Sequence, residues 1–154
     1  MKKNLFSALM CFLTLSVSAQ SISSQYVDLG LPSGTKWKST NEDGVYTYLS
    51  AKYYFGDALP NSAQFDELLY NCTWRWTGKG FRVTGPNNNY IFFPFDGYAD
   101  CDENMHNVGV CSFLWTINGA GSNWAYGCWL SDSQKDILEN DNCIGGSVRL
   151  VLNE

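Results

Sequence analysis

The stretch that decides the fold spans residues 26–37 and reads Tyr26-Val27-Asp28-Leu29-Gly30-Leu31-Pro32-Ser33-Gly34-Thr35-Lys36-Trp37. Apolar and polar residues alternate over residues 26–29 and again over residues 35–38, which is the period of a strand with one face in water. The segment between them contains proline and glycine, which supply the backbone angles that a chain reversal needs. The pattern therefore predicts an N-terminal hairpin.

One helix is predicted further along the chain, after the aromatic residues 40–59, which lack a clean period and are expected to be mostly irregular. Pro60 precedes Asn61, a good N-cap residue, and Gln64 follows three residues later, as in a capping box. The apolar residues that follow recur at the spacing of one helix face, and they are Phe65, Leu68, Leu69 and Cys72.

Short strands are predicted after the helix, separated by turns that contain glycine or asparagine. They are expected at residues 74–76, 81–83, 90–93, 124–130 and 147–152. Residues 96–109 are polar and loop-like, and residues 131–142 are also polar. One short helix with many short antiparallel strands defines an α+β fold.

The first 19 residues have the pattern of a cleavable signal peptide. Lys2 and Lys3 precede an apolar run at residues 5–17, and the small residues Val17-Ser18-Ala19 predict cleavage before Gln20. The run is shorter than the roughly 20 residues that a membrane-spanning helix needs. Cys11 lies inside the run, whereas a lipid-modified cysteine should end it. We therefore expect an exported protein, which is periplasmic, on the cell surface or secreted.

The mature chain is expected to be one acidic domain. Removing 19 of 154 residues leaves 135, with a short extension at residues 20–25 and a folded domain at residues 26–154. Because both lysines of the leader are lost, 8 basic and 15 acidic residues remain, a net charge of −7. That charge argues against nucleic acid and acidic lipid surfaces as partners. No later stretch is apolar enough to predict a membrane span.

The mature chain contains five cysteines, an odd number for an oxidising compartment. The simplest account is that four of them form two disulfides and the fifth stays a free thiol. Cys101 and Cys111 flank one polar loop, while Cys128 and Cys143 could face each other across neighbouring strands. We therefore predict the disulfides Cys101–Cys111 and Cys128–Cys143, with Cys72 as a buried free thiol on the apolar face of the helix.

Further motifs follow the opening stretch in a fixed order. They are Leu59-Pro60, Phe65-Asp66-Glu67-Leu68-Leu69, Cys72-Thr73-Trp74, Val83-Thr84-Gly85-Pro86-Asn87, Ile91-Phe92-Phe93-Pro94 and Gly146-Ser147-Val148-Arg149-Leu150-Val151. Together with residues 26–37, this order resembles the Fibrobacter succinogenes major paralogous domain family, which is abundant in gut Bacteroidetes. The resemblance covers residues 26–152.

The resemblance implies a C-type-lectin-like fold, related to that of formylglycine-generating enzymes, in a secreted or cell-surface protein. It implies little about activity, because fold does not fix function. The chain departs from the family between Trp37 and Leu59, where the usual glycine-rich and acidic stretch is absent. It also has Leu114-Trp115-Thr116 where the family has a Trp-Ser-Ser turn, with Cys101 and Cys111 inserted before it.

The ligand-binding candidates are polar and aromatic residues near the C-terminal end, where lectin-like folds build their ligand surface from loops. They are Trp115, Asn118, Asn123, Trp124 and Tyr126. Trp and Tyr rings stack on sugars or anchor peptides, and Asn supplies paired donors and acceptors. The alternative for Trp115 and Trp124 is that their rings fill the core. Arg149 is out of phase with its apolar neighbours and is interpreted as a buried structural cation.

Two other kinds of site are disfavoured. The acidic loop could offer oxygen ligands to calcium, but its spacing matches no EF-hand, and a solvated loop is the favoured interpretation. Its members are Asp96, Asp100, Asp102, Glu103 and Asn104. His106 is the only histidine, and no serine lies in a nucleophile-elbow motif. The close cysteine pair that holds copper in formylglycine-generating relatives is also missing. We therefore expect no enzyme activity, metal or cofactor.

These observations support a secreted, non-catalytic binding domain that recognises a carbohydrate or protein surface through its C-terminal loops. The alternative is a structural or assembly subunit of a cell-surface protein complex. A subunit should expose a sizeable apolar patch, which distinguishes the two functions.

Overall fold

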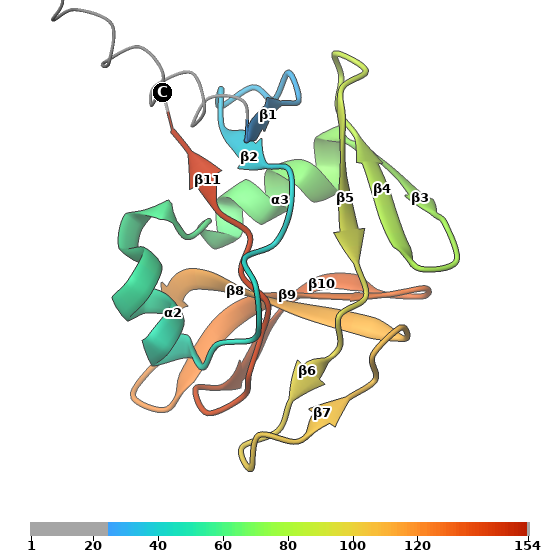
Figure 1. Cartoon of the computed structure of the whole chain (residues 1–154). Helices are drawn as coiled ribbons and strands as arrows, with labels where there is room; N and C mark the ends of the chain where they lie inside the picture. Colours follow the sequence, from blue (N-terminus) through green and yellow to red (C-terminus); the bar gives the residue numbers. More distant parts are fainter. Residues whose placement is uncertain (1–24, 154) are drawn as a thin grey trace, which may run out of the picture.

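The computed structural model describes residues 25–153 of the chain (Figure 1). The predicted leader at residues 1–19 and the extension up to residue 24 lie outside the described residues, so cleavage before Gln20 stays a prediction. Among residues 25–153, no helix is both long and apolar enough to cross a membrane.

The part of the chain that the structure describes has an α+β fold, with two α-helices and short antiparallel strands arranged in small sheets. The helices are α2 (Tyr48–Phe55) and α3 (Ser62–Asn71), with a 3-10 turn, η1 (Gly56–Ala58), between them. The first strands are β1 (Tyr26–Asp28), β2 (Lys36–Lys38), β3 (Thr73–Trp76), β4 (Gly80–Thr84) and β5 (Tyr90–Pro94). The later strands are β6 (Tyr98–Ala99), β7 (Met105–His106), β8 (Cys111–Gly119), β9 (Trp124–Ser131), β10 (Lys135–Asp141) and β11 (Val151–Leu152).

The predicted N-terminal hairpin is confirmed. Strands β1 and β2 pair antiparallel with Val27 opposite Trp37, and β11 pairs with the other edge of β2, placing Val151 opposite Trp37 as well. The Trp37 ring is fully buried. Gly30 begins the reversal at φ +71°, and a Cβ atom there would lie 3.0 Å from Asn87, so the turn requires glycine.

The predicted helix is also confirmed, as α3. The side chain of Asn61 accepts a hydrogen bond from the backbone N–H of Gln64, and the Gln64 side chain accepts one from the N–H of Asn61. Phe65 and Leu68 are fully buried, and the Phe65 ring centroid lies 5.0 Å from that of Trp37. The capping box thus fixes where the helix starts, and its apolar face anchors it to the N-terminal hairpin.

The second helix corrects the expectation that residues 40–59 are mostly irregular. The hydroxyl of Thr47 accepts a hydrogen bond from the N–H of Ser50 and so caps α2, which ends at Gly56. Only Tyr48 and Ala51 are buried on this helix. Because the other aromatic side chains of α2 stay partly or fully exposed, the sequence lacks the apolar period by which helices are found.

The sheet β8–β9–β10 has cores on both faces. Leu114 and Cys128 point into the core shared with α3, while Phe113, Trp115 and Ala125 point into the core shared with α2. A strand buried on both faces carries no alternation. Strand β10 lies within the polar residues 131–142, for which no strand was predicted, and pairs with β9 at the outer edge of the sheet.

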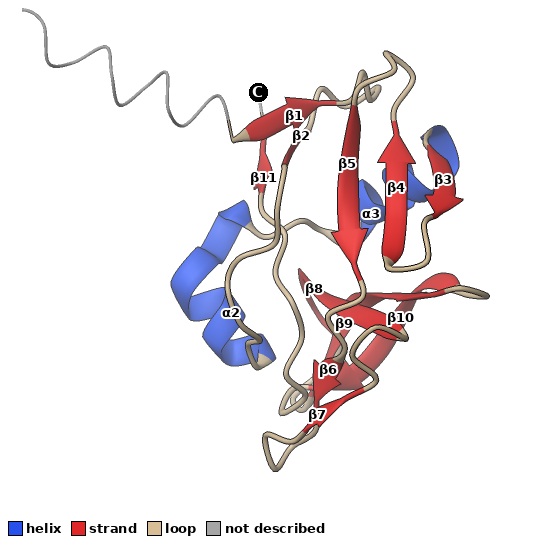
Figure 2. Ribbon diagram, turned by 45° about the vertical axis from the view of Figure 1, so that its right-hand side comes forward, coloured by secondary structure: helices blue, strands red, loops and turns tan. Residues whose placement is uncertain are grey.

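The sheet β3–β4–β5 confirms the strands predicted at residues 74–76, 81–83 and 90–93. Its inner face presents Val83 and Phe93, both fully buried, to helix α3. The indole N–H of Trp74 donates to the carbonyl oxygen of Leu68 on that helix. In Figure 2 the helix lies behind this sheet, and no helix or strand of the described residues covers the front.

The final strand is shorter than the predicted span of residues 147–152. Only residues 151–152 form β11, where Val151 is buried and Leu152 is exposed. Arg149 is fully buried, which confirms it as a structural cation. Its guanidinium donates to Asn41 Oδ1 and to carbonyl oxygens of three further residues. Burial lowers its pKa to about 9, and the charges of Asp96 and Glu42 oppose that change, so the group stays charged at neutral pH.

The predicted disulfide pairs are wrong, because the structure joins Cys101 to Cys143. Ala99 and Gly145 exchange backbone hydrogen bonds of 2.8 and 3.0 Å as an antiparallel pair. Two residues further on, that register sets Cys101 opposite Cys143, with their Cα atoms 5.0 Å apart. Three cysteines remain free among residues 25–153: Cys111 and Cys128, which are buried, and Cys72, which is only half-buried.

Candidate functional site

The five predicted ligand-binding residues lie on the β8–β9 hairpin rather than on long loops. Trp115 and Asn118 belong to β8, Trp124 and Tyr126 belong to β9, and Asn123 lies in the connection between them. The Trp115 side chain is fully buried, and its indole N–H donates to the carbonyl oxygen of Tyr46. Trp115 therefore exposes no surface to a ligand. Its ring fills the core, which is the alternative interpretation given for it above.

A shallow hollow of about 520 Å³ brings two of the predicted residues together. Its lining comes from the start of α3 and from all three strands of the β8–β9–β10 sheet, and consists of Asn61, Ser62, Ala63, Asn118, Gly119, Tyr126 and Ile137. Gly119 and Ala63 contribute little bulk, so the floor stays open. The hollow is therefore a small, mainly apolar depression with polar groups at its rim.

The polar groups of the hollow are held in place by hydrogen bonds. Asn118 Oδ1 accepts from the backbone N–H of Ser62 at 2.8 Å, which leaves the Nδ2 group of this exposed side chain without a partner among residues 25–153. The phenol of Tyr126 donates to Glu139 Oε1 at 2.8 Å, and the hydrogen bond and charge of Glu139 raise the pKa of Tyr126. A bound molecule would thus meet an amide donor opposite an aromatic ring.

Trp124 and Asn123 lie beside the hollow without lining it. Residues 124 and 126 project from the same face of β9, and their Cα atoms are separated by about 7 Å along the strand. Trp124 is 49% exposed, and Asn123 is exposed in the connection. Trp124 could therefore extend the aromatic surface that starts at Tyr126, whereas Asn123 is not part of this surface.

The acidic loop forms the small hairpin β6–β7, and the carboxylate of Asp100 accepts hydrogen bonds from within this hairpin. Asp100 Oδ1 accepts hydrogen bonds from the backbone N–H groups of Asp102 and Asn104, and Oδ2 contacts His106 Nε2 at 2.7 Å. Asp96 lies before the hairpin and accepts from Asn41. The hydrogen bond with His106, followed by those from Asn104, lowers the pKa of Asp100 to about 2.

We expect this hairpin to loosen in acid. The pKa of Asp100 is lowered from 3.8 in the unfolded chain to about 2, so its contribution is present above pH 4 and is lost as the pH falls towards 2. An NMR titration of the Asp100 side-chain carboxyl carbon should show a midpoint near pH 2. Asp100→Asn serves as the control, because it removes this signal and so identifies it, and a midpoint near 4 for Asp100 in the natural chain would contradict the assignment.

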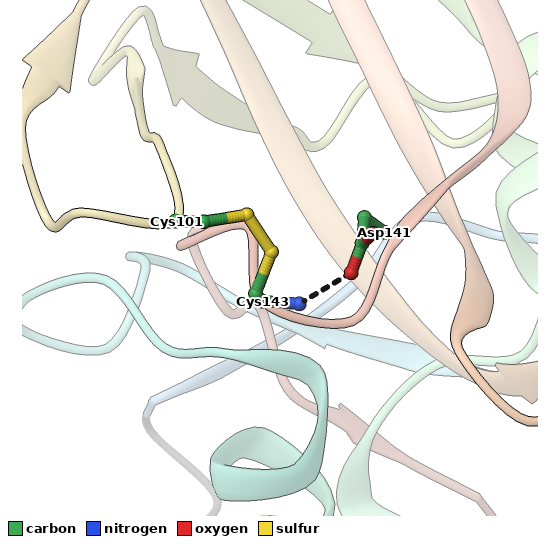
Figure 3. A group of neighbouring side chains, drawn as sticks. All are labelled: Cys101, Asp141 and Cys143. Carbon is green, nitrogen blue, oxygen red and sulfur yellow. Dashed lines mark hydrogen bonds between the residues drawn. A yellow bond between two sulfur atoms is a disulfide. The ribbon is translucent and has the colours of Figure 1, made fainter.

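A second cluster joins Cys101, Cys143 and Asp141 (Figure 3). The carboxylate of Asp141 accepts a hydrogen bond from the backbone N–H of Cys143. Both sulfur atoms are committed to the disulfide, and a metal would require them as thiolates. This cluster is therefore a structural cross-link, and disulfides of this kind persist in oxidising compartments, consistent with the expected export.

Sequence reasoning missed the residues that complete the hollow, above all Ser62, Ala63 and Ile137. The signal for Ser62 was the capping box, which places the residue after Asn61 at the exposed start of a helix. Ile137 has no comparable signal, because it belongs to the polar stretch 131–142. The comparisons with known proteins add no candidates: no family model matches the chain, and neither the curated proteins nor the solved structures include a significant match.

Proposed function

We propose that the protein is an exported, non-catalytic binding domain with a C-type-lectin-like fold, which recognises a carbohydrate or protein surface through the hollow between β8–β9 and α3. The supporting observation is the pairing, across one depression, of the unpartnered amide donor of Asn118 with the ring of Tyr126. Sugars and peptide side chains both offer an acceptor next to an apolar face, and this pair of groups fits such a unit.

The test is a glycan and host-protein array probed with the mature protein, followed by variants of the hollow. Trp124→Ala should weaken binding of the best array ligand, while the melting temperature changes little because half of this ring is already in water. Asn123→Ala is the matched control, since Asn123 is exposed nearby but does not line the hollow. Binding unaffected by Trp124→Ala would remove Trp124 from the proposed surface.

Asn118→Ala should abolish binding at a measurable cost in stability. Because Asn118 Oδ1 accepts from the N–H of Ser62 in the first turn of α3, its loss should lower the free energy of unfolding by about 1 kcal/mol. Thermal melts beside pull-downs on the array ligand separate the two effects. A variant that melts earlier but binds normally would show that Asn118 only supports the helix.

A second candidate function is supported by helix α2, whose outer side carries uncovered apolar residues. Leu49, Tyr53 and Tyr54 are 66%, 84% and 68% exposed. A patch of this kind fits the alternative of a structural or assembly subunit, which would bury it against another protein. Sedimentation velocity decides between them: concentration-dependent association that is lost in Tyr53→Ser would favour assembly, and a monomer at all concentrations would favour the binding domain.

A further inference from the structure

The uncovered face of the β3–β4–β5 sheet carries an ordered set of side chains. The strand register aligns them in two rows across the three strands. The first row is Arg75, Arg82 and Phe92, and the second is Thr73, Thr84 and Tyr90. All except Thr84 are exposed, and α3 covers only the opposite face (Figure 2). We call these six residues the arginine face.

The two arginines of this face have no counter-charge within the described structure. They lie directly opposite each other in the antiparallel pair, an arrangement that destabilises a sheet when the charges are alike. Neither forms an ion pair with a carboxylate among residues 25–153. The guanidinium carbon of Arg82 instead lies over the Tyr90 ring, 3.8 Å from its centroid, which is a cation–π contact.

The surrounding sequence is also unusually basic for this chain. Residues 68–95 include Arg75, Lys79 and Arg82 but no aspartate or glutamate, although the whole chain has 15 acidic residues. Lys79 is exposed in the turn that joins β3 to β4. This stretch therefore carries three positive charges and no negative one, within a protein whose net charge is negative.

We propose that the arginine face binds an anionic polysaccharide, whose sugar units carry carboxylate or sulfate ester groups. A guanidinium binds either anion through two parallel hydrogen bonds, and the positive charge of this pair is not neutralised by any carboxylate among residues 25–153. The exposed rings of Tyr90 and Phe92 supply apolar surface for the faces of the neighbouring sugars.

Charge density favours a polysaccharide over nucleic acid. Duplex DNA carries one charge for about every 1.7 Å of its axis, and the acidic remainder of this protein would repel so dense a polyanion. A polysaccharide with about one charge per sugar needs only the few cations that the arginine face offers. The proposal does not depend on the hollow, because the two surfaces share no residue.

The test measures binding of the exported protein to polygalacturonate, dextran sulfate and neutral dextran by affinity electrophoresis. We expect retardation by one or both anionic polymers and none by neutral dextran; the polymer that binds shows whether carboxylate or sulfate is preferred. Arg75→Gln/Arg82→Gln should weaken that binding by about tenfold per arginine, as expected for loss of a charge-assisted hydrogen bond. The melting temperature of this double variant should stay unchanged or rise, because the repulsion between the two like charges is removed.

Lys52→Gln on α2 is the charge-matched control for the single variant Arg75→Gln, and it should leave binding unchanged. Arg75→Gln alone, at an exposed position of an edge strand, also serves if the double variant does not fold. The proposal fails if neither anionic polymer binds, if Lys52→Gln weakens binding as much as Arg75→Gln, or if an oligodeoxythymidylate or a poly-glutamate peptide binds more tightly. Loss of polygalacturonate or dextran sulfate binding in Asn118→Ala would also overturn it, by locating these ligands in the hollow.

Discussion

Trp115→Ala is expected to lower the free energy of unfolding by about 3–5 kcal/mol and to leave much of so small a protein unfolded. Trp115 is fully buried between β8 and α2. Its ring centroid lies 4.6 Å from that of Phe113 and 5.4 Å from that of Tyr48. Truncation would leave a cavity at the contact between the sheet and α2, which has few other buried side chains to hold it.

Trp124→Ala is the matched control, because it removes the same side chain from a position that is half in water. We expect it to cost far less, and urea denaturation of both variants measures the difference. Trp115→Phe keeps an aromatic ring but loses the indole N–H and some volume. Since the carbonyl oxygen of Tyr46 also accepts from the N–H of Gly146, the lost hydrogen bond by itself should cost only about 1 kcal/mol, so this variant should be less destabilised than Trp115→Ala. Equal losses for Trp115→Ala and Trp124→Ala would contradict the assignment of the core.

Loss of the Cys101–Cys143 disulfide is expected to destabilise the protein by about 4 kcal/mol, the loop-entropy value for a sequence separation of 42 residues. The double variant Cys101→Ser/Cys143→Ser should therefore unfold at a much lower urea concentration than the oxidised protein. The cross-link ties the β6–β7 hairpin to the segment after β10, so these two regions should lose protection first.

Cys72→Ser is the control for that variant, because Cys72 is a half-buried free thiol and its replacement should change stability little. Protein that consists of residues 20–154 should also contain three titratable thiols after denaturation without reductant. In the folded protein these thiols should react slowly, since burial raises the pKa of Cys72 to about 11 and also raises those of Cys111 and Cys128. Peptide mapping that finds Cys101 joined to Cys111 would contradict the observed pairing.

The elements that sequence reasoning located are those with a local cause. The hairpin at residues 26–38 follows from two alternating segments around a proline–glycine turn, and α3 follows from its capping box and apolar face. Helix α2 was missed because most of its aromatic residues face outward. Strand β10 was missed because it is a polar edge strand whose partner, β9, supplies the hydrogen bonds that define it.

For the candidate site, too, some features could be predicted from the sequence and others only from the tertiary structure. The sequence alone singled out Asn118, Trp124 and Tyr126 by residue type, and it left open whether each tryptophan was buried. Only the tertiary structure placed Trp115 inside the core and Trp124 at the surface, because the burial of a ring depends on which distant segments pack against it. The hollow likewise needs the start of α3 to lie against β8, β9 and β10.

The sequence by itself determined the hairpin of residues 26–38 and α3, since each depends on neighbours within a few positions along the chain. The partners of Arg149 come from distant segments, because its guanidinium donates to Asn41 Oδ1 and to the carbonyl oxygen of Phe92. Only the tertiary structure decided which cysteines join. Cys101 and Cys143 are far apart in sequence and meet through the backbone pair of Ala99 and Gly145, whose register no local pattern encodes. Long-range pairing is selected by the whole core, because loop closure must be offset by contacts that form only in the folded chain.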